Sequence, residues 1–186
     1  LLDQNTYNLN NYNEFATVVK EYNDLLDKAD VINKILPADY RDAFFQLVLH
    51  PVKASANLNE LYLNVALNNR QYNTLRNHLV NIFGERAVQK YINDSLITLQ
   101  YHQLNNGKWN HLMDQAHIGY TYWQQPPRQK IPDIKFVPQD SIVQADEDFV
   151  NPIYKTSKDL IPKGTKGNVF YEQQFSGVSI DASHFT

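Results

Sequence analysis

The sequence lacks several features that would point to particular protein classes. It contains no cysteine, so disulfide bonds and thiol chemistry are excluded. It contains no run of about 18 apolar residues, so we expect no membrane-spanning helix. Positive charge is not in excess, because the formal net charge is -3 and the pI is about 6.1. This balance argues against binding to nucleic acid.

Cofactor motifs are also missing. Gly164 and Gly167 do not form the G-x-x-x-x-G-K pattern of a phosphate loop, and we expect no bound cofactor. The sequence begins with Leu1 and has one methionine, Met113, so we expect it to be part of a longer protein. It shows no signal peptide, which in part of a longer chain leaves the location of the whole protein open.

Aromatic residues are abundant, with 12 tyrosines and 9 phenylalanines, although the apolar and charged fractions are ordinary for a globular protein. Two interpretations compete. The aromatic rings can fill a core, or they can stack on the apolar faces of sugar rings. Composition alone favours core packing.

The first predicted helix covers residues 11–36. Asn11 is its expected N-cap, and Glu14 follows three residues later as in a capping box. Pro37 ends the helix, because the residue before a proline is driven out of helical geometry. Apolar side chains spaced three and four apart form one stripe: Tyr12, Phe15, Val19, Tyr22, Leu26 and Ala29.

A second helix is predicted to begin at Ala38 or Asp39. Pro51 lies in its middle, which allows either one kinked helix or two helices that meet at this proline. The apolar stripe keeps its register across Pro51 and favours a kinked, nearly continuous helix. Its members are Phe44, Leu47, Ala54, Leu58, Leu61 and Val65.

Two further helical regions follow. One begins near Tyr72, carries Leu75, Leu79 and Ile82 on one face, and is expected to end at Gly84. The other carries the stripe Val88, Ile92, Leu96 and Leu99 and stops near residues 105–107, which read Asn-Asn-Gly. Together these patterns predict an all-α fold: an antiparallel bundle of four to five helical segments over residues 7–125.

The chain changes character after the bundle. Pro126 and Pro127 force extended backbone, and residues 131–137 suit either a short strand or an extended arm. We therefore predict an extended arm and linker over residues 126–168. Residues 169–171 and 178–182 are strand-like, so residues 169–186 are expected to begin a truncated β domain.

Residues 108–125 hold the densest group of polar and aromatic side chains. On a helix, His111, Asp114 and His117 would lie near one face and could meet a metal. The H-E-x-x-H spacing of helical zinc sites is absent, however, so hydrogen bonding within an irregular segment is the preferred interpretation and no metal is assigned.

The aromatic residues of this segment allow three interpretations. Trp109, Tyr120, Tyr122 and Trp123 can form an interdomain interface, a plug that seals the end of the bundle, or a platform for a sugar ligand. We rank them in that order. The candidate residues for the rim of a substrate site or for an interdomain contact are Trp109, His111, Asp114, His117, Tyr120 and Trp123.

Three blocks of the sequence resemble glycoside hydrolase family 115. They are residues 107–123, which read GKWNHLMDQAHIGYTYW and are followed by Pro126-Pro127, residues 37–48, and residues 51–61. The resemblance covers residues 7–137, and residues 179–185 are similar to the entry into the family's C-terminal β-sandwich. Ala116 departs from the family pattern, which has a threonine at this position.

The resemblance implies a bacterial xylan α-1,2-glucuronidase that removes (4-O-methyl)glucuronic acid, with a location outside the cytoplasm, secreted or periplasmic. In such an enzyme this chain is the helical bundle, and the catalytic barrel lies upstream. Glycoside hydrolysis needs two flanking carboxylates, and no pair is singled out among Asp39, Asp42, Glu60, Asp94 and Asp114. We therefore assign no catalytic residue.

The expected role is a non-catalytic scaffold that packs against the barrel of the same protein, which acts on glucuronoxylan and can form a homodimer. The chain alone is expected to be inactive. The alternatives are a stand-alone carbohydrate-binding module and an oligomerisation domain. We expect neither a nucleic-acid nor a membrane partner.

Overall fold

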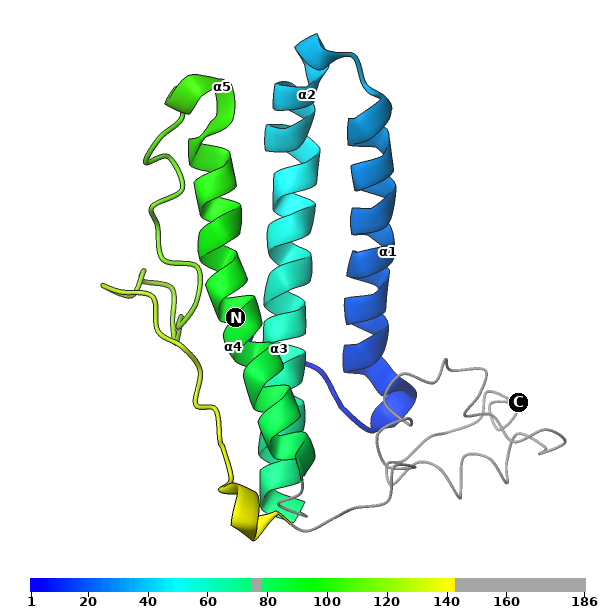
Figure 1. Ribbon diagram of the computed structural model, residues 1–186, viewed down its shortest axis with the longest axis vertical. Helices are drawn as coiled ribbons and strands as arrows, with labels where there is room; N and C mark the ends of the chain where they lie inside the picture. Colours follow the sequence, from blue (N-terminus) through cyan, green and yellow to red (C-terminus); the bar gives the residue numbers. More distant parts are fainter. Residues whose placement is uncertain (75–77, 143–186) are drawn as a thin grey trace, which may run out of the picture.

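A computed structural model describes residues 1–74 and 78–142 of the chain. The all-α prediction is confirmed by the helices α1 (Glu14–Ile35), α2 (Ala38–Phe44), α3 (His50–Thr74) and α4 (His78–His102), which the short α5 (Leu104–Gly107) follows. Figure 1 shows α1 and α4 on either side of α3, each antiparallel to it. The described residues contain no strand, and they contain no helix that is long and apolar enough to cross a membrane.

The predicted N-cap Asn11 does not begin α1, because the residue before α1 is Asn13, which makes no side-chain cap hydrogen bond. Asn8 instead binds backbone donors of the preceding turn. The Asn8 side-chain Oδ1 accepts the backbone N–H groups of Asn10 and Asn11, both at 2.8 Å. Glu14 reaches back to accept the backbone N–H of Asn8 at 2.8 Å. This reciprocal pair satisfies backbone donors at the start of η1 (Asn11–Asn13), the short 3-10 turn that precedes α1.

The predicted stripe of α1 is confirmed over most of its length. Phe15, Val19 and Ala29 are buried, and Tyr22 and Leu26 are half-buried. Tyr12 is the exception, because its backbone takes a φ of 58° in η1 and its side chain stays mostly exposed. The predicted stripe is therefore wrong at Tyr12, which precedes the start of α1.

The proline at position 51 is accommodated by a change of helix type. α2 continues into α3 through the π-helical segment η2 (Phe45–Leu49), which confirms the nearly continuous helix. The backbone N–H of His50 donates to the carbonyl of Phe45, five residues back. The extra residue in this turn rotates the preceding positions, so Phe45 and Leu49 are buried and the predicted Leu47 is exposed.

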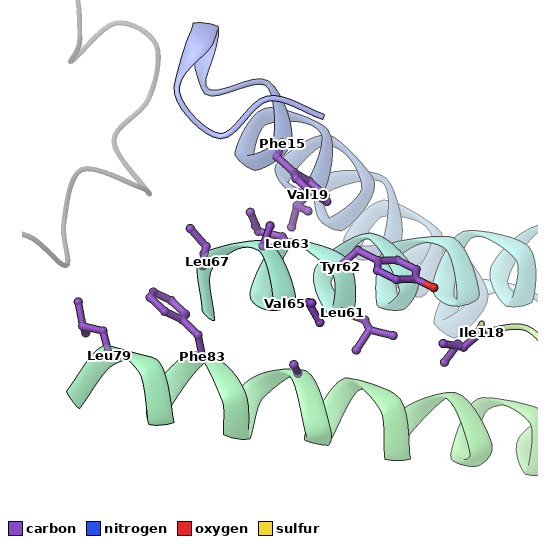
Figure 2. Close-up of a cluster of buried hydrophobic side chains, with 12 residues drawn as sticks. Phe15, Val19, Leu61, Tyr62, Leu63, Val65, Leu67, Leu79, Phe83 and Ile118 are labelled. Carbon is purple, nitrogen blue, oxygen red and sulfur yellow. The ribbon is translucent and has the colours of Figure 1, made fainter. Parts of the chain in front are cut away.

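The centre of the core is α3, which is buried on every side from residue 61 to residue 68. α1 covers one side of it and α4 the other, and Figure 2 shows Phe15 and Val19 reaching toward α3 from above while Leu79 and Phe83 approach from below. Burying each large apolar side chain contributes about 1.5–3 kcal/mol. Because residues 61–68 are buried on every side, this part of α3 has no outward polar face of the kind that an ordinary amphipathic helix has.

Gly84 does not end a helix, contrary to the prediction. It lies inside α4, and Tyr72 belongs to the last turn of α3. A Cβ atom at Gly84 would lie 2.9 Å from the Phe136 ring and 3.2 Å from the Asn68 amide nitrogen. The glycine thus permits the close approach of a later segment to α4, which is a packing role and not a termination signal.

The predicted stripe of α4 was wrong at three positions. Ile92, Leu96 and Leu99 are about half exposed. The face that packs on α3 carries a different set of buried side chains: Leu79, Phe83, Ala87, Asp94, Ile97 and Tyr101. Both faces of α4 have helical spacing. The buried face includes the polar residue Asp94, so the spacing of apolar residues alone does not identify it. The predicted stop is confirmed, since α4 ends at His102 and Asn105, Asn106 and Gly107 have positive φ.

Residues 126–142 form an extended arm that lies along α4 and ends near the junction of α3 and α4 (Figure 1). Two asparagines hold it. The amide of Asn68 donates to the Lys135 carbonyl and accepts its N–H, both at 2.8 Å, and Asn81 makes the same pair with Val137 at 2.9 Å. Residues 143–186, including the predicted strands and the predicted β domain, lie outside the described residues.

Candidate functional site

The segment after Gly107 folds as a chain of turns and not as a helix. The N–H of Asn110 donates to the Gly107 carbonyl at 3.0 Å, and that of Leu112 to the Trp109 carbonyl at 3.2 Å. His111 has a φ of 66°, which ends any regular progression. A spacing of three therefore does not bring the side chains of His111, Asp114 and His117 to one face.

His111 and Asp114 form an exposed pair with each other. His111 Nδ1 lies 2.7 Å from Asp114 Oδ2. Behind them, His102 Nε2 accepts the backbone N–H of Met113 at 3.2 Å, which fastens the segment to the end of α4. This pair lies at a turn on the surface. Exposed ion pairs contribute little to stability, so its expected effect on the free energy of unfolding is small.

His117 turns the other way and meets a buried carboxylate. Its Nδ1 lies 3.1 Å and 3.2 Å from the two oxygens of Asp94 on α4. Gln129 on the arm completes the group, since its amide donates to Asp94 and its Oε1 accepts the backbone N–H of His117 at 2.7 Å. Three parts of the chain thus meet at the Asp94 carboxylate: α4, residues 107–123 (the motif segment) and the arm.

The environment shifts the pKa values of two histidines in opposite directions. The hydrogen bond to Asp94 raises the pKa of His117, against the smaller opposing effect of burial. Burial lowers the pKa of His50, and the nearby charge of His117 lowers it further.

The described residues contain no cluster of three His, Cys, Asp or Glu side chains that could hold a metal ion. Among the carboxylates, Glu60 pairs with Lys90 and accepts a hydrogen bond from Asn23, and Asp39 and Asp42 are exposed on α2. Asp114, the remaining candidate, lines the same hollow of about 290 Å³ as Asp94. The contacts that the structure shows for Asp94 are the hydrogen-bonded pair with His117 and the bond from Gln129.

The aromatic residues of the segment separate into half-buried and exposed members. Trp109 packs with Met113 against the cluster formed by Ala29, Phe45, Leu49 and Tyr101, where it closes one end of the bundle. The hydroxyl of half-buried Tyr120 accepts a hydrogen bond from Gln115 at 2.9 Å. Trp123 is 93 % exposed and Tyr122 is 59 % exposed. The four aromatic residues, Trp109, Tyr120, Tyr122 and Trp123, therefore do not form one stacking platform.

A cavity of about 400 Å³ lies between the motif segment, α3 and α4. His117 and His50 line it together with an apolar wall and a few polar side chains. Its volume is within the range of small-ligand sites, about 300–1,000 Å³. A second hollow of about 290 Å³ lies between His117 and residues 125–129.

The important residues that the sequence did not reveal are His50, Gln129, Asn68 and Asn81. His50 carried a signal, because it directly precedes Pro51 where the helix was expected to distort. Asn68 carried one too, as a polar residue within the apolar run of α3. Gln129 and Asn81 carried none.

No protein-family model matches the chain, and the comparison with curated proteins finds no match.

Proposed function

We propose that this chain is a non-catalytic scaffold domain of a xylan-debranching α-glucuronidase of the glycoside hydrolase 115 type. Its motif segment, residues 107–123, is the surface that meets the catalytic barrel of the same protein. The proposal rests on the three sequence blocks and on the way the segment is held.

The exposure of Trp123 is the observation that carries the proposal. The inner side of the motif segment is fixed by His117, Asp94 and Gln129, and its outer side presents Trp123 almost wholly to solvent. Large aromatic residues held on an ordered surface are typical of contact sites between domains.

The proximity of two of the blocks gives further support. Ala54 and Leu58, from the block at residues 51–61, line the same cavity as Ala116 and His117 from the motif segment. Residues that are distant in sequence thus build one region of the surface. The exposed Leu112 adds an apolar side chain from the same segment.

The test is Trp123→Ala in the full-length protein that contains this chain. We expect the release of glucuronic acid from glucuronoxylan to fall by about tenfold or more, as for the loss of one central interface anchor. Melting of the 186-residue chain should be unchanged, because Trp123 is exposed. Tyr40→Ala, which removes an exposed aromatic on α2, is the control. Unchanged activity and unchanged melting of the full-length Trp123 variant would contradict the proposal.

A second candidate function is self-association, which the exposed stripe of α4 favours. Ile92, Leu96 and Leu99 are spaced four and three apart, the pattern of a helix that packs against another helix. Light scattering of the 186-residue chain tests it. A strict monomer at high concentration would count against this candidate and leave the first one standing.

A further inference from the structure

The end of α4 holds the motif segment through a hydrogen bond that only the neutral form of histidine can make. The Nε2 atom of His102 accepts the backbone N–H of Met113 at 3.2 Å, and the His102 side chain is only 11 % exposed. A neutral imidazole accepts at one ring nitrogen and donates at the other, whereas the protonated ring donates at both and accepts at neither. The bond to Met113 therefore depends on the charge of His102.

An acceptor for the protonated ring lies beside the same nitrogen. Oδ1 of Asp114 is 3.6 Å from His102 Nε2, and its second oxygen, Oδ2, is 2.7 Å from Nδ1 of His111. The distance of 3.6 Å is too long for a hydrogen bond, but a small movement of the turn closes it. A bond between a charged donor and a charged acceptor is about twice as strong as a neutral one. Nε2 of His102 thus has one partner for each charge state of the ring.

Other charged and titratable groups reach this end of α4 from two sides. They are Asp114, His111 and Lys108 from the motif segment and His50 and Lys53 from α3. The two groups on α3 contact Tyr101 and Gln100, and Lys108 lies over the Trp109 ring. The His111 ring centroid is 6.0 Å from that of His102. When both rings are protonated, the Asp114 carboxylate offsets their repulsion.

A second attachment of the motif segment responds to acid in the opposite way. The hydrogen bond between His117 and Asp94 raises the pKa of His117, so this ring keeps its proton and its partner as the pH falls. Acidification therefore affects the attachment at residue 113 and leaves the one at residue 117 in place.

We propose that His102 is a pH-sensitive switch in the attachment of the motif segment: the neutral ring binds the Met113 amide, and the protonated ring releases this amide and binds Asp114. The proton comes from solvent, and no covalent bond between heavy atoms changes. Histidine is the side chain whose charge ordinarily changes between about pH 5 and 8, so the switch acts in that range. The proposal is independent of the role of the domain in a larger enzyme.

The experiment is NMR spectroscopy of the nitrogen-labelled 186-residue chain. A scalar coupling across the N–H···N hydrogen bond, between the Met113 amide nitrogen and His102 Nε2, reports the bond directly. We expect this coupling at about pH 8 and its loss at about pH 5, between which an ordinary histidine gains its proton. A coupling that remains at about pH 5, or no coupling at about pH 8, would overturn the proposal.

Two variants separate the two halves of the switch, each in a His111→Gln background that removes the neighbouring titration. His102→Gln keeps an acceptor for the Met113 amide but takes up no proton, so the Met113 amide resonance should stay in place across this range. Asp114→Asn removes the charged acceptor, so the loss of the coupling should move to a pH lower by about one unit. The parent transition in the His102→Gln chain, or an unchanged midpoint in the Asp114→Asn chain, would also overturn the proposal.

Discussion

Asp94 is the residue on which the candidate site is organised. A buried carboxylate must be paired and hydrogen-bonded, because removing an unpaired charge from water costs several kcal/mol. Asp94 meets this need with His117 and Gln129, which come from two segments that have no regular secondary structure of their own. The carboxylate therefore fixes the course of the chain after α4.

The His117–Asp94 pair predicts a pH-dependent contribution to stability. The pKa of His117 is raised in the folded chain, so the folded state holds this proton more tightly than the unfolded state does. The contribution is complete below the ordinary histidine pKa of about 6.5 and is lost as the pH rises through the folded-state pKa. His117→Gln should lower the free energy of unfolding by about 1 kcal/mol more at acidic pH than at alkaline pH.

Urea unfolding of both proteins across this pH range measures the difference. His50 titrates with the opposite sign, because its pKa is lowered. Its contribution is present at high pH and is lost as the pH falls, so both proteins are best compared in a His50→Gln background. His111→Gln serves as the control and should show no such dependence. A destabilisation by His117→Gln that is the same at every pH would refute the charged pair.

Asn68 is the second residue with a clear consequence for stability. It is fully buried, and its amide joins the Val80 carbonyl at 2.7 Å to both backbone groups of Lys135. Asn68→Ala leaves these groups unsatisfied and should reduce the free energy of unfolding by about 2–4 kcal/mol. Asn73→Ala, at an exposed position on the same helix, should change it by less than about 0.5 kcal/mol. Similar midpoints in denaturant for the two variants would refute this role.

At the scale of elements, the all-α fold and the register of α1 were predictable, whereas the registers of α2 and α4 were not. The stripe of α1 and the stop at residues 105–107 follow from local chemistry, namely apolar spacing and residues that accept positive φ. The register of α2 failed because the π-helical turn at residues 45–49 inserts one residue. A pattern read from spacing alone does not reveal such an insertion.

The candidate site was predictable as a region but not as a geometry. The density of polar and aromatic residues marked residues 107–123, and His117 was among the candidate residues, whereas Asp94 was one of five carboxylates among which no pair was singled out. Their pairing spans 23 positions in the sequence and depends on the path of the turns. Gln129 gave no signal, because it acts only once the arm has folded back.

The arm provides a prediction at this scale. Asn81 supplies both hydrogen bonds of Val137, so Asn81→Ala should expose the amide of Val137 to solvent. Hydrogen exchange at that amide should accelerate by about tenfold or more, as expected for the loss of about 1.4 kcal/mol of local protection. Amides in the middle of α3 should be unaffected. Unchanged exchange at Val137 would mean that the arm is held by packing alone.

At the scale of the whole molecule, the chain buries its apolar surface unevenly. α3 is enclosed by α1, α4 and the arm, whereas the elements around it leave large apolar side chains in solvent, among them Ile35 on α1, Leu47 in η2, Leu96 on α4 and Trp123 after the turns. In the function that we propose, the catalytic barrel of the larger protein covers Trp123.

The most direct test is to assay two proteins on glucuronoxylan for the release of glucuronic acid. One is the 186-residue chain, and the other is the full-length protein that contains it. The account predicts release by the full-length protein and none by the chain alone. Release by the isolated chain, or inactivity of the full-length protein on this glycan, would contradict it.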